Sequence, residues 1–261
     1  MALSGLTRKD AEFLINEADI FVLADAAHQV ARKYFGDVVT FVNNVVVNYS
    51  DVCVAKCPIC AFYRPPGQGY IKTPQEVAAL VEQFVERYGV TELHINGGFN
   101  PLLTPEYFDE LFKTIKKRAR VVVKGPTLAE VEYYASLWRT SREEVLSRWK
   151  EAGLDAISGG GAEVFAEEVR KIVAPHKISG EQWIETAKIA HRLGISTNAT
   201  LLYGHVESPR HVVDHIFRVK ELQVETGGVL LFIPVKYNPA NTELYIKGVV
   251  KRPAPSIYDL K

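Results

Sequence analysis

Short apolar, β-rich runs alternate with helical patterns along most of this chain, and this alternation is the feature that most limits its fold. Such nearly continuous apolar runs are typical of strands that are buried on both faces of a parallel sheet. Parallel neighbours need a crossover helix between them, so the alternation predicts an α/β protein. Six runs have the composition of strands: Asn44–Ser50, Glu92–Asn96, Arg120–Lys124, Leu154–Ser158, Ile195–Tyr203 and Gly228–Val235.

Every gap between these runs contains a helical pattern with a start signal. The signals pair an N-cap oxygen with proline at the first helical position, or with an acid or amide three residues later. They are Thr73-Pro74 with Glu76, Thr104-Pro105, Thr127 with Glu130, Ser141 with Glu144, Ser179 with Gln182, and Ser208-Pro209. We therefore expect a partial barrel of six βα units, and a doubly wound open sheet, which has the same local pattern, stays the alternative.

A separate helical pattern precedes the first run. It covers residues 8–35, and Thr7 and Asp10 have the spacing of a capping box at its start. No linker or low-complexity run divides the remainder of the chain. We expect residues 1–42 to form an N-terminal helical extension and residues 43–261 to form the barrel core.

The composition excludes several classes of function. Of 261 residues, 47 % are hydrophobic, and 31 basic residues balance 31 acidic ones. A chain without net charge lacks the single-sign field that attracts nucleic acid or anionic lipid, so we expect a small-molecule substrate, no nucleic acid and no membrane. No apolar run reaches the ~20 residues of a membrane span, and charges stand where a signal peptide needs its apolar region, so we expect a cytoplasmic protein.

All three cysteines of the chain fall within eight residues, at Cys53, Cys57 and Cys60. Three thiolates on one short loop can bind three irons of a 4Fe–4S cluster and leave the fourth iron open to a small ligand. A zinc site that borrows a histidine and three cysteines without a shared role are the alternatives. Structural zinc sites usually combine two separated ligand pairs, and no second Cys/His pair is present.

The candidates for a site are the residues that directly follow the strands, because a parallel barrel forms its site at the carboxyl ends of its strands. Glycine there lets backbone amides approach a ligand closely. His205 follows the fifth run, where an imidazole could contact a carboxylate substrate or relay protons; a structural role is the alternative. His94, inside the second run, could point into the barrel. Weaker candidates for binding a carboxylate are Lys124, Lys236 and Tyr237.

The segment Cys53–Arg64 (CVAKCPICAFYR) resembles the signature loop of radical S-adenosylmethionine (SAM) enzymes. The resemblance implies a 4Fe–4S cluster on the three cysteines, SAM on the open iron, and an external one-electron donor of flavodoxin or ferredoxin type. Gly97-Gly98 resembles the family's glycine pair, whose backbone meets the methionine amino group. Phe62 and Tyr63 lie where this loop contacts adenine. Asn100 stands near a position where many members carry a carboxylate.

Glu163 follows the fourth run, where a carboxylate could bind the ribose hydroxyls of this cofactor. The alternative is an acidic residue in the first turn of the next helix, where it interacts favourably with the helix dipole.

A narrower resemblance covers residues 38–244. Four segments are similar to the group that contains the two futalosine-pathway enzymes of menaquinone biosynthesis and the deazaflavin FO synthase subunits: Asn48–Cys53, Cys60–Arg64, Gly159–Glu163 and Glu225–Gly228. His94–Gly98, Asn198–His205 and Asn238–Leu244 favour the aminodeoxyfutalosine synthases, whereas Tyr63–Gly67 is closer to the dehypoxanthine futalosine cyclases.

The resemblance to the synthases implies a transferase that adds the 5′-deoxyadenosyl radical to 3-[(1-carboxyvinyl)oxy]benzoate, giving 6-amino-6-deoxyfutalosine. The cyclase reaction, an FO synthase subunit and a non-catalytic, truncated metal-binding paralogue stay open as alternatives. Members of the group run further and close the barrel with additional strands, so we expect this core to lack its usual C-terminal strands.

Overall fold

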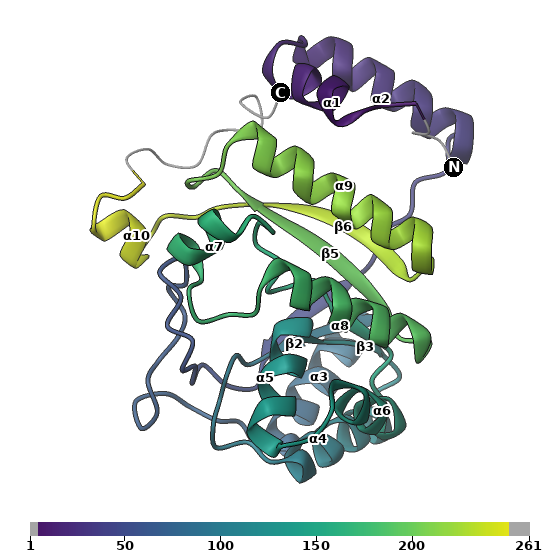
Figure 1. Cartoon of the computed structure of the whole chain (residues 1–261). Coiled ribbons are helices and arrows are strands. Elements are labelled where there is room, and N and C mark those ends of the chain that lie inside the picture. Colours follow the sequence, from purple (N-terminus) through teal and green to yellow (C-terminus); the bar gives the residue numbers. More distant parts are fainter. Residues whose placement is uncertain (1–4, 251–261) are drawn as a thin grey trace.

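The computed structural model describes residues 5–250 and contains one parallel sheet of six strands (Figure 1). The strands are β1 (Asn44–Asn48), β2 (Glu92–Asn96), β3 (Val122–Thr127), β4 (Ala156–Ser158), β5 (Ser196–Tyr203) and β6 (Val229–Lys236). Each strand pairs with the next one in the sequence, in parallel. This order confirms the partial barrel. The doubly wound alternative is wrong, because it requires the strand order to reverse within the sheet.

Helices precede, connect and follow the strands, and seven of those in the described residues begin at the predicted start signals. The helices are α1 (Arg8–Asn16), α2 (Ile20–Phe35), α3 (Pro74–Tyr88), α4 (Pro105–Arg118), α5 (Leu128–Trp138), α6 (Arg142–Ala152), α7 (Glu167–Val173), α8 (Gly180–Arg192), α9 (Pro209–Thr226) and α10 (Glu243–Ile246). Thr73, Thr127 and Ser179 each form both hydrogen bonds of a capping box. The sequence did not predict α7 or α10. The N-cap of α7, Ala166, has no side-chain oxygen that could have signalled a start.

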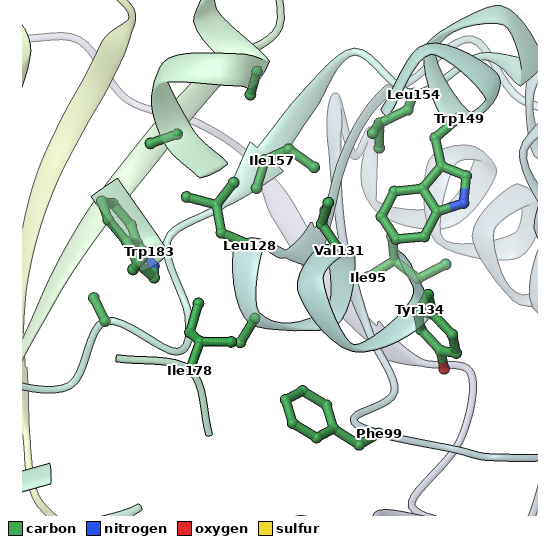
Figure 2. Packing of buried hydrophobic residues seen from close by; sticks show 14 of the residues in the cluster. Ile95, Phe99, Leu128, Val131, Tyr134, Trp149, Leu154, Ile157, Ile178 and Trp183 are labelled. Atoms are coloured by element: carbon green, nitrogen blue, oxygen red, sulfur yellow. The ribbon is translucent and has the colours of Figure 1, made fainter. Parts of the chain in front are cut away.

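The hydrophobic core lies between the sheet and its outer helices (Figure 2). Leu93 and Ile95 of β2 are fully buried and alternate with partly exposed Glu92, His94 and Asn96. Because side chains alternate across a strand, the two sets lie on opposite faces. Large fully buried side chains include Trp149, Trp183, Tyr134, Phe108 and Phe112. Burying one such side chain contributes about 1.5–3 kcal/mol of hydrophobic free energy.

The segment predicted as one helix over residues 8–35 consists of two helices. The capping box of Thr7 and Asp10 is present, but α1 ends at Asn16, and Asp19 caps α2 by accepting from the amides of Phe21 and Val22. Helix α1 packs against α9, where Arg8 pairs with Asp214 at 2.7 Å. The proposed division at residue 43 stays a prediction, and residues 1–4 and 251–261 lie outside the described part of the chain.

Strands β1 and β6 are the two edges of the sheet, and within residues 5–250 each pairs on one side only. Leu230 and Leu231 of β6 are about half exposed, as is Val46 of β1. No helix in the described residues is both long and apolar enough to cross a bilayer.

Candidate functional site

A cavity of about 660 Å³ lies at the carboxyl ends of β1 to β4. It is lined by residues from the end of each of these strands and from the loops that follow them. The sequence-predicted candidates in the lining are Cys53, Cys57, Cys60, Phe62, Tyr63, Gly97, Gly98 and Glu163. The structure thus brings eight predicted site residues, separated by up to 110 positions in the sequence, to one cavity.

All three cysteines of the cavity are free thiols, and Cys57 is the most deeply buried of them. The Cys60 amide donates to the Cys57 carbonyl at 2.9 Å, and the Phe99 amide donates to Cys53 Sγ at 3.3 Å. Among residues 5–250, no three His, Cys, Asp or Glu side chains converge closely enough for one metal ion. A four-iron cluster binds each thiolate on a different iron and needs no such convergence. The donor set therefore fits that cluster.

Burial raises the pKa of the Cys57 thiol to about 11. The nearby Lys177 ammonium lowers this pKa, whereas the Glu163 carboxylate raises it. A coordinated metal deprotonates a thiol, so binding of a metal centre at Cys57 would release a proton.

The glycine pair after β2 fits its place only without side chains. A Cβ on Gly97 would lie 2.0 Å from the Tyr49 ring, and one on Gly98, where φ is +72°, would lie 3.0 Å from Cys53 Cβ. Both amides donate to Glu130 Oε1, at 3.1 and 3.0 Å. A carboxylate of the protein therefore already occupies the two N–H groups of this pair. A contact of this backbone with the methionine amino group stays a prediction.

Glu130 is a lining residue whose contribution to the site the sequence analysis missed. Its side chain is buried, and the Tyr49 hydroxyl donates to Oε1 at 2.6 Å. Burial and this carboxylate raise the pKa of Tyr49 well above its usual range. The only sequence signal was the capping box with Thr127, which predicts the start of α5 but not the contact with the glycine pair.

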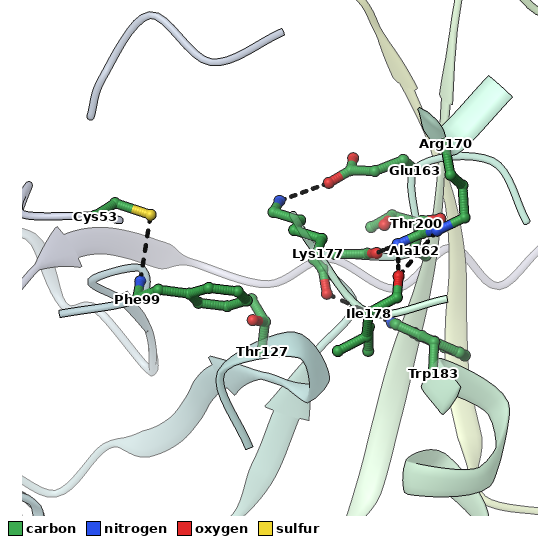
Figure 3. A network of polar contacts seen from close by, with 12 residues as sticks. Cys53, Phe99, Thr127, Ala162, Glu163, Arg170, Lys177, Ile178, Trp183 and Thr200 are labelled. Atoms are coloured by element: carbon green, nitrogen blue, oxygen red, sulfur yellow. Dashed lines mark hydrogen bonds and ion pairs between the residues drawn. The ribbon is translucent and has the colours of Figure 1, made fainter. Parts of the chain in front are cut away.

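Glu163 forms an ion pair with Lys177, with 2.7 Å between Oε1 and Nζ (Figure 3). Burial alone would raise the pKa of Glu163, but the Lys177 charge and hydrogen bond hold it below its usual range. The same partner raises the pKa of Lys177 against the effect of burial. Glu163 is therefore an ionised acceptor at the cavity wall. Lys177 carries no strand-end signal, and the sequence analysis missed it.

A buried arginine holds the loop that carries Glu163 (Figure 3). Arg170 donates to the carbonyl oxygens of Gly161 at 3.1 Å, Ala162 at 2.5 Å and Ile178 at 2.9 Å. Burial lowers the pKa of Arg170. Five donors in a rigid plane allow one guanidinium to bind several carbonyls, which lysine cannot reproduce.

His205 lies outside the cavity lining, with its ring buried. Nε2 is 3.0 Å from the Leu202 carbonyl oxygen, Nδ1 is 3.0 Å from Glu207 Oε2, and the ring contacts Tyr237 edge-on. These contacts are suited to holding the loop after β5. The catalytic role expected for His205 stays a prediction.

The other candidates also lie outside the cavity lining. Glu92 pairs with His94 Nε2 at 2.5 Å and with Lys124 Nζ at 2.9 Å. Asn100 is buried and donates to Ser50 Oγ at 2.9 Å, so it supports the loop after β2. Tyr237 is buried beside Thr242, and Lys236 is exposed.

The family model of the Radical SAM superfamily matches residues 47–219. The chain therefore belongs to the radical SAM superfamily, as its cysteine loop predicted. Its fold also matches methylornithine synthase, with a TM-score of 0.73 at 18 % identity, over 92 % of this chain and 67 % of that structure. At this identity the match supports the fold alone.

Similar curated proteins have three different names. Aminodeoxyfutalosine synthase of Thermus thermophilus is 39 % identical over 244 residues, which are 92 % of this chain and 65 % of the relative. 5-amino-6-(D-ribitylamino)uracil--L-tyrosine 4-hydroxyphenyl transferase of Methanopyrus kandleri is 38 % identical over 238 residues, which are 90 % of this chain and 64 % of the relative. Cyclic dehypoxanthine futalosine synthase of Streptomyces coelicolor is 35 % identical over 246 residues, which are 92 % of this chain and 61 % of the relative.

These matches confirm the resemblance to the futalosine-pathway group. The chain spans 61–65 % of the length of these three relatives.

Proposed function

We propose that this chain is a radical SAM enzyme of menaquinone biosynthesis that forms 6-amino-6-deoxyfutalosine from SAM and 3-[(1-carboxyvinyl)oxy]benzoate. The observation that carries the proposal is that three cysteine thiols, a glycine pair and an ionised Glu163 line one cavity. The similarity to aminodeoxyfutalosine synthase over 92 % of the chain supports this particular reaction.

Cys53, Cys57 and Cys60 would hold the 4Fe–4S cluster, which would supply the electron for cleavage of SAM to methionine and a 5′-deoxyadenosyl radical. In this proposal the radical carbon would bond to the vinyl carbon of the substrate. After rearrangement the carboxyl group would leave and become bicarbonate with oxygen from one water, releasing a proton, and the unpaired electron would return to the cluster, so that no net electron is consumed per turnover. The adenosyl group stays in the product, so SAM is a substrate. A flavodoxin or ferredoxin supplies the electron, and the reducing cytoplasm suits the thiolate ligands.

The protein's own residues bind and orient the cofactor. Phe62 and Tyr63 lie on the wall formed by the cysteine loop, where an aromatic ring can stack on adenine. Glu163 accepts hydrogen bonds from the ribose hydroxyls, and its ion pair with Lys177 keeps it ionised for this purpose. Orientation of the adenosyl group relative to the vinyl bond is the main contribution that such a site makes to the rate.

Two other reactions remain candidates because relatives with those names are similarly close. The cyclase reaction would abstract a hydrogen from dehypoxanthine futalosine and release free 5′-deoxyadenosine. The similarity of 38 % to the M. kandleri transferase favours, as a further candidate, a transfer of the hydroxyphenyl group of tyrosine to a ribitylaminouracil.

Mass spectrometry of anaerobic reactions tests the proposal. Reduced, reconstituted protein is incubated with SAM and, separately, with the enolpyruvyl benzoate, with dehypoxanthine futalosine, and with tyrosine plus the ribitylaminouracil. An adenosyl group inside the first product is expected. If a product forms only with dehypoxanthine futalosine, or only with tyrosine plus the ribitylaminouracil, the corresponding reaction replaces the proposed one.

A matched analysis of iron and acid-labile sulfide tests the cluster. The Cys57→Ala variant is expected to lose both. Stoichiometric zinc without sulfide in the unsubstituted protein would instead indicate the non-catalytic metal-binding alternative.

A further inference from the structure

The buried Glu130 carboxylate joins three segments of the site, and the proposed reaction assigns it no task. Oε1 accepts from the Tyr49 hydroxyl at 2.6 Å and from the amides of Gly97 and Gly98 at 3.1 and 3.0 Å. Oε2 accepts from the amide and the hydroxyl of Thr127, both at 2.8 Å. One side chain thereby binds the end of β1, the loop after β2 and the start of α5.

These contacts require a carboxylate. All five contacting groups are donors, and an ionised carboxylate accepts on both of its oxygens. A glutamine has one acceptor oxygen, and its NH₂ group would face a donor whichever way it turned. Hydrogen bonds to an ionised acceptor are also roughly twice as strong as neutral ones.

The loop that Glu130 holds leads directly to a cysteine of the site. Gly98 adopts a left-handed backbone conformation with φ of +72°, and the next amide, that of Phe99, donates to Cys53 Sγ at 3.3 Å. The Phe99 carbonyl accepts from the Val54 amide at 2.9 Å, and its ring stacks on Tyr133. The direction of the Phe99 N–H bond therefore depends on the glycine turn that the Glu130 carboxylate fixes.

Hydrogen bonds to ligating sulfurs are among the factors that set the reduction potential of an iron–sulfur cluster. An N–H donor stabilises the more negative, reduced state of the cluster and so raises the potential. We propose that Glu130 is a positioning residue that holds the Phe99 amide against Cys53 Sγ and thereby raises the reduction potential of the bound cluster. The effect on the reduction potential, the redox part of the proposal, rests on the proposed function. The positioning of the Phe99 amide by Glu130, the loop part, rests only on contacts within this chain.

Amide hydrogen exchange in the cluster-free protein tests the loop part. In the Glu130→Gln variant, the amides of Gly97, Gly98 and Phe99 are expected to exchange about tenfold faster, as follows from losing one hydrogen bond. Glu132→Gln is the matched control, because Glu132 lies on the same helix and pairs with Arg142 at 3.4 Å, away from the cavity lining. Unchanged exchange in Glu130→Gln would overturn the proposal.

A second pair of variants covers the case in which the glutamine variant does not fold. Glu130→Asp keeps the charge but is one methylene shorter, so it cannot reach both the glycine amides and Thr127. It is expected to show the same faster exchange, relative to Glu132→Asp. Wild-type exchange in a folded Glu130→Asp protein would equally overturn the loop part.

A potentiometric titration of the reconstituted proteins, followed by electron paramagnetic resonance, tests the redox part. At equal iron content, Glu130→Asp, which keeps the negative charge, is expected to have a more negative midpoint potential than the unsubstituted protein, and Glu132→Asp an unchanged one. An unchanged potential in Glu130→Asp despite faster exchange would overturn the redox part. Failure of the unsubstituted protein to bind a cluster would contradict the proposed function, while the exchange data still decide the loop part.

Discussion

Lys177 Nζ and Glu163 Oε1 lie 2.7 Å apart at the wall of the cavity that contains the three cysteine thiols. Both side chains are mostly buried, at 22 % and 11 % exposed. Breaking a buried ion pair leaves an uncompensated charge, which costs far more than breaking a pair in water. The relationship therefore gives a direct test of how the site depends on Lys177.

Lys177→Met is expected to destabilise the protein by about 2–3 kcal/mol, because Glu163 would be left buried and unpaired. Urea denaturation measures the difference in the free energy of unfolding. Lys188→Met is the matched control, because Lys188 pairs at 2.9 Å with Glu225, which is 57 % exposed. That pair is expected to contribute less than about 1 kcal/mol. Equal decreases in the free energy of unfolding of the two variants would contradict the claim that burial makes the Lys177–Glu163 pair the more costly one to break.

Arg170→Lys is expected to lower the thermal midpoint, because the carbonyls of Gly161, Ala162 and Ile178 share one guanidinium. Each buried carbonyl left without a donor costs about 1–3 kcal/mol. Calorimetry on the cluster-free protein measures the loss. Arg118→Lys is the control, because Arg118 pairs with Glu82 at the surface; a loss of the same size there would refute the proposed role of the carbonyl contacts.

His215 makes the stability of the fold dependent on pH. Burial lowers its pKa to about 3, and the charges of Arg170 and Arg218 also disfavour protonation; its ring stacks on Phe165 at 3.9 Å. Because the unfolded chain binds this proton near pH 6.5, the unfolded state is favoured as pH falls from about 6.5 towards 3. The contribution approaches ~1.4 kcal/mol per pH unit within that window.

Denaturation of the wild-type and His215→Phe proteins between pH 7.5 and 4.5 measures this contribution. The phenylalanine variant keeps an aromatic ring against Phe165 and removes the titrating group, so its free energy of unfolding is expected to fall less steeply with acid. His28→Phe, on the exposed helix α2, is expected to retain the wild-type slope. Parallel slopes in all three proteins would rule out His215 as the source.

The two possible roles of His205 make different predictions for two substitutions. His205→Ala is expected to reduce turnover without changing the cluster spectrum, either by loss of proton transfer or by release of the loop after β5. His205→Gln keeps an N–H donor for the Leu202 carbonyl, which is 3.0 Å from Nε2. If the residue positions the loop, glutamine restores most of the turnover. If it transfers protons, both variants lose activity by about 100-fold or more.

The order of strands and the starts of most helices could be predicted because their signals are local. Apolar runs define the strands, and Thr73, Thr127 and Ser179 cap the helices that follow them. Helix α7 has no such signal, because Ala166 has no side-chain acceptor. The break before α2 was missed, although Asp19 is a suitable cap.

The site was predictable only where residue type and strand-end position were informative. The cysteines, the glycine pair and Glu163 met that condition. Lys177 meets its partner across 14 positions, and Glu130 meets Gly97 across 33. Such contacts depend on how strands and helices pack, which no local pattern specifies. The direction of the His94 side chain was likewise not determined by alternation along β2.

Glu130 is both the N3 residue of the α5 capping box and the acceptor for the glycine amides. Fraying of the first turn of α5 would therefore release the loop that contacts Cys53. Helix ends open locally at a much lower free energy than the whole fold. Order at the cysteine loop is consequently linked to a local unfolding equilibrium at the start of α5, so a ligand that orders one also protects the other.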